Sequence, residues 1–257
     1  MTPLLRLTDV RKTFGGLVAV NALSFEIEAG AIVAMIGPNG AGKSTVFNLI
    51  TGVYEPTSGA IDLDGRTICG LKTHAIAGLG IARTFQNIRL FAFMSALDNV
   101  MTGRHSRMRA SLFDSLLHTP AQRGEEKRVR ERARELLRFC GLEREADDYA
   151  RNLSYGHQRR LEIARALASE PKLLLLDEPA AGMNPREKSD LIELIRRIRD
   201  SGVTVFLIEH DMHLVMNVSE RITVLDHGEK IAEGLPEAVR NDDRVIEAYL
   251  GRETPAG

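Results

Sequence analysis

Tryptophan is absent from the 257-residue sequence, and cysteine occurs only twice. Cys69 and Cys140 form no C-x-x-C pair and have no cluster of further ligands beside them, which argues against a disulfide scaffold and favours a reducing compartment. We expect both to be small buried hydrophobic residues. No apolar run approaches the ~18–20 residues that span a bilayer, and the N-terminus lacks the basic-then-apolar build of a secretion signal. These absences predict a protein that is cytosolic or attached to a membrane through partners.

A strong charge of either sign is also missing. The 34 Lys and Arg residues nearly balance the 35 Asp and Glu residues, and the formal net charge is -1. There is therefore no global electrostatic case for binding nucleic acid or an anionic membrane surface. A composition of 44% hydrophobic and 27% charged residues is ordinary for a globular protein with a sizeable core. The length suits one large α/β domain or a domain with a small appendage.

Short apolar runs predict a parallel sheet. Residues 31–36 and 173–176 are continuous apolar segments, and 203–208 are apolar except for Thr204, a composition typical of strands that are buried on both faces. Residues 186–200 have the spacing of an amphipathic helix and lie between the last two strands. Strands that alternate with helices imply a mainly parallel sheet with both faces covered.

The two ends of the chain have the pattern of antiparallel strands. Strands are expected at residues 5–10 and 17–27, with a turn at Asn21 and Ala22, where the alternation of apolar residues breaks. Hairpin turns are expected at Asp64-Gly65 and at His227-Gly228, because these pairs favour tight two-residue turns.

The middle of the chain, residues 95–151, is helical in pattern and highly charged. Its clearest helix spans 125–141 and is closed by Gly141. The charges on its other face alternate in sign, which favours a solvated helix face over a nucleic-acid patch. Residues 104–124 are expected to form a basic loop. The apolar face of the helix 125–141 consists of Val129, Ala133, Leu136, Leu137 and Cys140.

Residues 37–45 match the phosphate-binding pattern G-x-x-x-x-G-K-[ST], between an expected strand and an expected helix. Glycines let several backbone N–H groups point at one anion, and the helix adds the positive end of its dipole. Lys43 is expected to reach the outer phosphates, and the Ser44 hydroxyl to bind Mg²⁺. The alternative is a chance glycine-rich turn before a structural helix. The predicted nucleotide-contacting residues are Gly37, Pro38, Asn39, Gly40, Ala41, Gly42, Lys43, Ser44 and Thr45.

Acidic residues follow the expected strand 173–176, at the sheet edge where ligands bind in such folds. Asp177 is expected to hold Mg²⁺ through water. Glu178 is expected to orient or deprotonate the water that attacks the γ-phosphate; the alternative is that both acids simply begin a loop. His210 follows the neighbouring strand, and periodicity alone leaves open a γ-phosphate role or a turn residue.

Together these motifs resemble an ATP-binding cassette (ABC) ATPase, the motor subunit of membrane transporters, across nearly the full chain. The signature segment 153–160 lies between Gln86 and the acidic strand, in the family's order. The resemblance implies that Gln86 binds Mg²⁺ and water and senses the membrane subunits. It also implies that Phe14 stacks on adenine beside Ala19, although Phe14 could also be a core residue. Ser154 and Gly156 would contact the γ-phosphate of ATP held by the opposite subunit.

Three departures from the broad family pattern occur at Tyr155, His157 and Asn184. The tyrosine and the asparagine are similar to those in the branch that imports branched-chain amino acids, whereas an imidazole at 157 cannot reproduce both amide functions of the usual glutamine. Segments 113–120, 178–185, 208–212 and 248–251 resemble the larger ATPase of the high-affinity importer. Alternatives are the ATPase of a urea or amide importer or a lipopolysaccharide exporter, a soluble ABC ATPase of DNA repair or translation, and a catalytically silent cassette.

The resemblance thus predicts an α/β P-loop NTPase core with a mainly parallel sheet, an N-terminal antiparallel β subdomain and an inserted α-helical subdomain. Residues 1–94 and 152–257 would form the RecA-like core with the β subdomain, and 95–151 the insertion, within one ABC domain. The expected cofactors are ATP and Mg²⁺. The expected partners are an identical or paralogous second ATPase, two integral permease subunits and, indirectly, an extracytoplasmic binding protein, at the cytoplasmic face of the plasma membrane. The permeases would dock between residues 86–93, with their apolar Ile88, Leu90 and Phe91, and the helical insertion.

Overall fold

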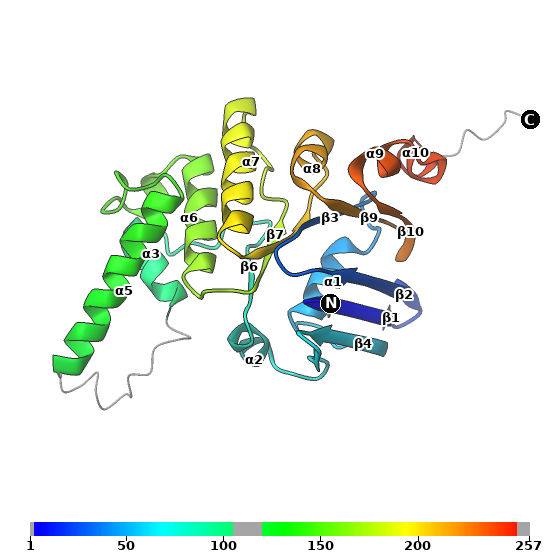
Figure 1. Cartoon of the computed structure of the whole chain (residues 1–257), viewed down its shortest axis with the longest axis horizontal. Helices are drawn as coiled ribbons and strands as arrows, with labels where there is room; N and C mark the ends of the chain where they lie inside the picture. Colours follow the sequence, from blue (N-terminus) through cyan, green and yellow to red (C-terminus); the bar gives the residue numbers. More distant parts are fainter. Residues whose placement is uncertain (1–2, 105–119, 251–257) are drawn as a thin grey trace, which may run out of the picture.

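The computed structural model describes residues 3–104 and 120–250, which form two β-sheets and a set of helices (Figure 1). Within these residues, no helix combines the length and the apolar character needed to span a membrane. The helices α3, α5 and α6 gather at one end of the molecule, and the strands β1, β2 and β4 lie at the other.

A mainly parallel sheet has the strand order β10-β9-β3-β8-β7-β6, and only β10 runs antiparallel to its neighbour. Every residue of β3, β7 and β8 is buried. This confirms the parallel sheet predicted from the short apolar runs. The strands are β3 (Ile32–Ile36), β6 (Ile81–Arg83), β7 (Leu173–Asp177), β8 (Thr204–Ile208), β9 (Arg221–Asp226) and β10 (Glu229–Gly234).

The core has two parts, one on each face of this sheet. Along β3, Ile32 and Ala34 face one hydrophobic cluster, and Val33 and Met35 face the other, as the two-residue period of a strand requires. The first cluster includes side chains of α3, α5, α6, α7 and α8. The second packs α1 and the antiparallel sheet against the opposite face.

The antiparallel sheet has the order β2-β1-β4-β5. The turn expected at Asn21 and Ala22 was wrong, because β2 runs through both residues. Ala22 has a φ of 45°, and the pairing with β1 shifts register between Val10 and Lys12. A β-bulge breaks the alternation here. The strands are β1 (Leu5–Phe14), β2 (Leu17–Ile27), β4 (Ser58–Leu63) and β5 (Arg66–Thr67).

Both predicted hairpin turns are confirmed. Asp64 and Gly65 have φ values of 52° and 74° and join β4 to β5. His227 and Gly228, with φ values of 44° and 81°, join β9 to β10. Positive φ at both central residues is the conformation that a two-residue hairpin favours.

Local capping fixes where two long helices begin. The Ser154 side chain accepts a hydrogen bond from the backbone N–H of His157 at the start of α6. Asn184 and Glu187 form a capping box at the start of α7, and Pro185 occupies its first turn. The helices are α1 (Lys43–Ile50), α2 (Thr73–Gly78), α3 (Ala96–Gly103), α5 (Pro120–Phe139), the 3-10 turn η2 (Ala150–Asn152), α6 (Tyr155–Leu167), α7 (Pro185–Asp200), α8 (Met212–Val218), α9 (Pro236–Arg240) and α10 (Asp243–Leu250).

The charged middle segment contains the helix predicted there. In α5 and just after it, Val129, Ala133, Leu136, Leu137 and Cys140 are all buried, and Gly141 follows at a φ of 74°. Residues 105–119 of the expected basic loop lie outside the described residues. The loop predicted for residues 120–124 was wrong, because α5 already begins at Pro120. Helix α6 begins after residue 151 and packs against α3 and α5. The division of the chain at residue 151 stays a prediction.

Candidate nucleotide-binding and catalytic site

The phosphate-loop sequence leaves β3 at the carboxyl edge of the parallel sheet and enters α1. Two of its glycines are required by close packing. A methyl group on Gly37 would lie 2.0 Å from the carbonyl oxygen of Leu225, and one on Gly42 would lie 2.4 Å from that of Ala19. Both have positive φ, 150° and 101°. Only glycine therefore fits these positions without moving the backbone.

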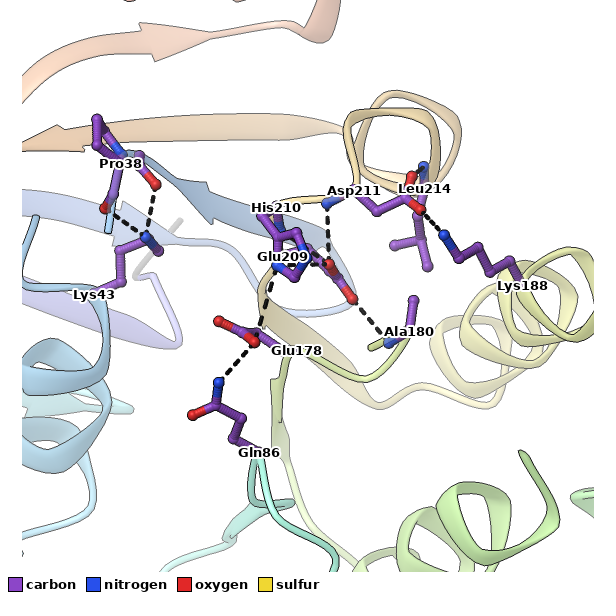
Figure 2. Close-up of polar contacts among 11 residues, drawn as sticks. Pro38, Lys43, Gln86, Glu178, Ala180, Lys188, Glu209, His210, Asp211 and Leu214 are labelled. Carbon is purple, nitrogen blue, oxygen red and sulfur yellow. Dashed lines mark hydrogen bonds and ion pairs between the residues drawn. The ribbon is translucent and has the colours of Figure 1, made fainter. Parts of the chain in front are cut away.

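Lys43, the first residue of α1, folds back over this loop (Figure 2). Its ammonium group donates hydrogen bonds to the carbonyl oxygens of Gly37, at 2.6 Å, and Pro38, at 2.9 Å. Burial lowers the pKa of Lys43, and the nearby carboxylates of Glu178 and Asp177 partly oppose that shift. The Lys43 ammonium thus lies on the concave side of a loop that is rich in backbone N–H groups. An ammonium and several N–H donors around one hollow are the groups that bind an anion such as a phosphate.

A hollow of about 550 Å³ joins this loop to residues from distant parts of the chain. Phe14 lies at its edge and is 40% exposed, so it is not a core residue. Its ring stands edge-on to Tyr54 with centroids 5.1 Å apart, and the ammonium of Lys12 lies 5.0 Å from the ring centroid. The hollow is lined by Phe14, Leu17, Val18, Ala19, Asn39, Gly40, Ala41, Gly42, Lys43, Ser44, Thr45, Gln86, Glu178 and His227.

Glu178 lies at the edge of the hollow, directly after β7. The Gln86 side-chain amide donates to Glu178 Oε2 at 2.8 Å, and Nδ1 of His210 lies 3.9 Å from the same oxygen (Figure 2). The backbone of Glu178 has a φ of 46°, and its N–H donates to the Ile208 carbonyl at 2.9 Å. A non-glycine residue in this conformation costs about 1–3 kcal/mol and is often found at functional sites.

Asp177 is buried as the last residue of β7 and does not line the hollow. The guanidinium of Arg83 donates to Asp177 Oδ2 at 2.8 Å and to Asn48 Oδ1 at 2.7 Å. The sequence argument did not assign Arg83 a role. Because its partners lie in α1 and β7, no local pattern in the sequence would have identified it.

Two oxygen donors that line the hollow, the Ser44 hydroxyl and the Gln86 amide oxygen, are hard ligands of the kind that Mg²⁺ prefers. The Asp177 carboxylate is buried beside Arg83 and outside the hollow, so it would reach such an ion through water. Among the described residues, no group of three or more His, Cys, Asp or Glu side chains is arranged to hold a metal by itself. Mg²⁺ typically uses one or two carboxylates together with phosphate oxygens and water.

Glu209 is a functional candidate that the sequence argument missed. Its side chain is buried, with 1% of the residue exposed. Its carboxylate accepts hydrogen bonds from the N–H groups of Ala180 (2.8 Å), His210 (2.9 Å) and Asp211 (3.1 Å) (Figure 2). Glu209 thereby ties the loop after β7 to the loop after β8. Its position directly after a buried strand, like that of Asp177 and Glu178, was the available signal.

Ser154 and Gly156 are not brought to the hollow; they lie at the start of α6. A methyl group on Gly156 would come 2.5 Å from Glu187 Oε1 in α7. The imidazole of His157 lies 3.7 Å from Glu145. The structure therefore divides the predicted site residues into two groups, one around the phosphate loop and one at the N-terminus of α6.

Comparison with known proteins gives consistent results. A family profile described as "ABC transporter" matches residues 20–181, and one described as "Branched-chain amino acid ATP-binding cassette transporter" matches residues 229–254. The high-affinity branched-chain amino acid transport ATP-binding protein BraF of Pseudomonas aeruginosa is 48% identical over 97% of this chain and 98% of its own length.

Two solved structures are similar to this chain. The ADP conformation of MJ1267, an ATP-binding cassette of an ABC transporter, aligns with a TM-score of 0.86 and 32% identity over 98% of this chain and all of that one. A dimeric post-hydrolysis state of the ATP-binding cassette MJ0796, bound to ADP and Pi, aligns with a TM-score of 0.76 and 28% identity over 90% of this chain and 98% of that one.

Proposed function

Because this chain belongs to the ABC transporter family of ATP-binding, ATP-hydrolysing proteins, we propose that it is the ATPase subunit of a branched-chain amino acid importer. The observation that carries the substrate class is the 48% identity to BraF over nearly the whole of both chains. The match of residues 229–254 to the branched-chain amino acid profile also supports it.

The phosphate loop and Lys43 hold the triphosphate of ATP. On binding, the Lys43 ammonium exchanges the carbonyl oxygens of Gly37 and Pro38 for phosphate oxygens, which satisfies its positive charge better. Phe14 provides a stacking surface for adenine beside Ala19. Ser44 and Gln86, with Asp177 acting through water, would hold Mg²⁺, and the ion would supply positive charge opposite the phosphates.

Glu178 is the general base of hydrolysis. Its carboxylate lines the same hollow as Lys43 and accepts a hydrogen bond from Gln86. It orients the attacking water and takes its proton, and the Gln86 amide fixes the position of the carboxylate. We assign to His210, on the next loop and with its Nδ1 3.9 Å from Glu178 Oε2, the role of donating a hydrogen bond to the γ-phosphate.

The active unit is a dimer in which Ser154 and Gly156 complete the ATP site of the other protomer. Two facts support this proposal. Neither residue lines the hollow of its own chain, and a similar cassette bound to ADP and Pi is dimeric. The exposed N-terminus of α6, capped by Ser154, offers N–H groups to a phosphate. The second protomer is an identical chain or a paralogue.

A permease subunit docks on each protomer at a second groove of about 600 Å³, which is lined by α2, β6, residues of the segment 85–91 and the ends of α3 and α6. Phe91 is exposed and lines this groove, whereas Leu90 packs partly against the core. The apolar surface available to a partner is therefore Phe91 with the exposed Phe93, and Ile88 and Leu90 contribute less. The protein would lie at the cytoplasmic face of the plasma membrane, and an extracytoplasmic binding protein would select the substrate.

Two experiments test the proposal. Purified Glu178→Gln protein should bind ATP normally and hydrolyse it ~10²–10⁴-fold more slowly, whereas Glu193→Gln, on the exposed face of α7, should hydrolyse normally. Turnover near the wild-type rate in Glu178→Gln would remove Glu178 from the mechanism. Reconstitution with the permeases, any second ATPase and the binding protein encoded by neighbouring genes should give ATP-dependent leucine uptake. Uptake of urea or amides instead, or extraction of lipopolysaccharide, would assign a different transporter.

A further inference from the structure

Arg159 in α6 is a charged side chain buried deep in the protein. Only 2% of the residue is exposed. Its guanidinium donates to the carbonyl oxygen of Phe85 at 2.6 Å and to that of Gln86. Both acceptors are backbone groups of the segment that carries the Gln86 side chain. The position of Gln86 is therefore set from α6, by a residue far away in the sequence.

Glu162, one turn further along α6, completes this attachment. Its carboxylate lies 3.3 Å from Arg159 and accepts the N–H groups of Phe85 and Arg89, each at 3.4 Å. Burial raises the pKa of Glu162, and the N–H of Arg89 and the charge of Arg159 partly oppose that shift. Arg159 thus binds the carbonyl groups of the segment 85–89, and Glu162 binds its N–H groups. Several hydrogen bonds to one segment restrict its position more than a single one would.

The same guanidinium also reaches the N-terminus of α6. Arg159 donates to the Tyr155 hydroxyl at 3.1 Å and lies 5.5 Å from the centre of its ring. Tyr155 stands between Ser154 and Gly156, and its ring packs close to the backbone of Gly182. One side chain therefore contacts both the segment expected to act on the partner's ATP and the segment expected to act on its own.

We propose that Arg159 is a positioning residue that links the N-terminus of α6 to Gln86, so that engagement of Ser154 by the partner's ATP sets the alignment of Gln86 with Glu178. This inference rests on the proposed function, because it uses the roles given there to Gln86, Glu178 and Ser154. A rigid helix carries the displacement: a shift of the start of α6 moves Tyr155, Arg159 and the Gln86 backbone together.

A double-mutant cycle in the purified full chain tests the link. Arg159→Gln alone should lower kcat about 10- to 100-fold, the size expected from a small misplacement of a reacting group, with the dissociation constant for ATP changed less than about twofold. In a Gln86→Ala background, the same substitution should change kcat less than about twofold, because the group that it positions is gone. Arg138→Gln, at an exposed ion pair in α5, is the matched control.

Tyr155→Phe tests the relay without disturbing the buried charges. It removes only the hydroxyl that accepts from Arg159. We expect a lower kcat, an unchanged thermal midpoint and no further effect in the Gln86→Ala background. If Arg159→Gln fails to fold, this variant decides the question alone. If Arg159→Gln or Tyr155→Phe lowers kcat in the Gln86→Ala background by the same factor as in the wild type, the inference is wrong. The proposed function is judged separately, by the loss of turnover in Glu178→Gln.

Discussion

Replacing Glu209 with glutamine should destabilise the protein measurably. The two carboxylate oxygens accept three backbone N–H groups, one from the loop after β7 and two from the loop after β8. Glutamine retains one acceptor oxygen, so the N–H of Ala180 or the pair from His210 and Asp211 loses its partner. A hydrogen bond to a charged group contributes about 1.5–3 kcal/mol. We therefore expect the free energy of unfolding to fall by about 2–3 kcal/mol.

Two separate assays test this prediction: the midpoint of thermal unfolding, and the rate of ATP turnover by the folded variant. For a protein of this size, each kcal/mol shifts the midpoint by about 2–4 °C, so Glu209→Gln should unfold roughly 4–12 °C below wild type. Turnover should also fall, because Glu178 and His210 lie on the two loops that Glu209 joins. The control is Glu220→Gln, which removes an exposed ion pair with Arg199 that is worth about 0–1 kcal/mol. If the two variants unfold at the same temperature, the bracing role assigned to Glu209 is wrong.

Three further predictions concern the phosphate loop and the buried cysteine. Lys43→Ala should raise the dissociation constant for ATP roughly 10- to 100-fold, since it removes charge-assisted hydrogen bonds to phosphate; an unchanged constant in equilibrium titration would contradict the loop assignment. Gly42→Ala should weaken ATP binding by more than about tenfold, because the methyl group would lie 2.4 Å from the Ala19 carbonyl at a φ of 101°; normal binding would show that the loop adapts. Burial raises the pKa of Cys140 to about 12, so thiol labelling at pH 8 should modify only Cys69 in the native protein and both thiols after unfolding.

Local chemistry was sufficient to predict most of the fold. Patterns within about 20 residues were enough to predict the strands β3, β7 and β8, the two hairpins and the apolar face of α5. In each case the spacing of apolar or turn-forming residues matched that of a strand, a tight turn or a helix. The turn expected at Asn21 and Ala22 failed because a bulge and a turn interrupt the alternation of a strand in the same way. Cys69, expected to be buried, is half-buried, and its sulfur accepts the N–H of Ile61.

The parts of the site that the sequence missed depend on distant partners. Arg83 meets Asp177 across 94 positions of the chain, and Arg159 meets the Gln86 carbonyl across 73. Glu209 braces Ala180 across 29 positions. Such contacts pair a side chain with a group that only the tertiary fold brings near, often a backbone atom that every residue carries. The side chains expected to meet ATP are identified by motifs, whereas no motif states which side chains hold them in place, even where such a residue, as Arg159 does, lies within a motif.

The claim at the centre of this account is that ATP joins two protomers at a shared site. Sedimentation velocity of the Glu178→Gln protein tests it most directly, because this variant retains ATP without consuming it. With saturating ATP and Mg²⁺ we expect a species of twice the mass of one chain, lost when ATP is removed and weakened by Ser154→Ala in the same background. A single-chain mass at saturating nucleotide, both for this chain alone and after addition of a paralogous ATPase encoded by a neighbouring gene, would contradict the account.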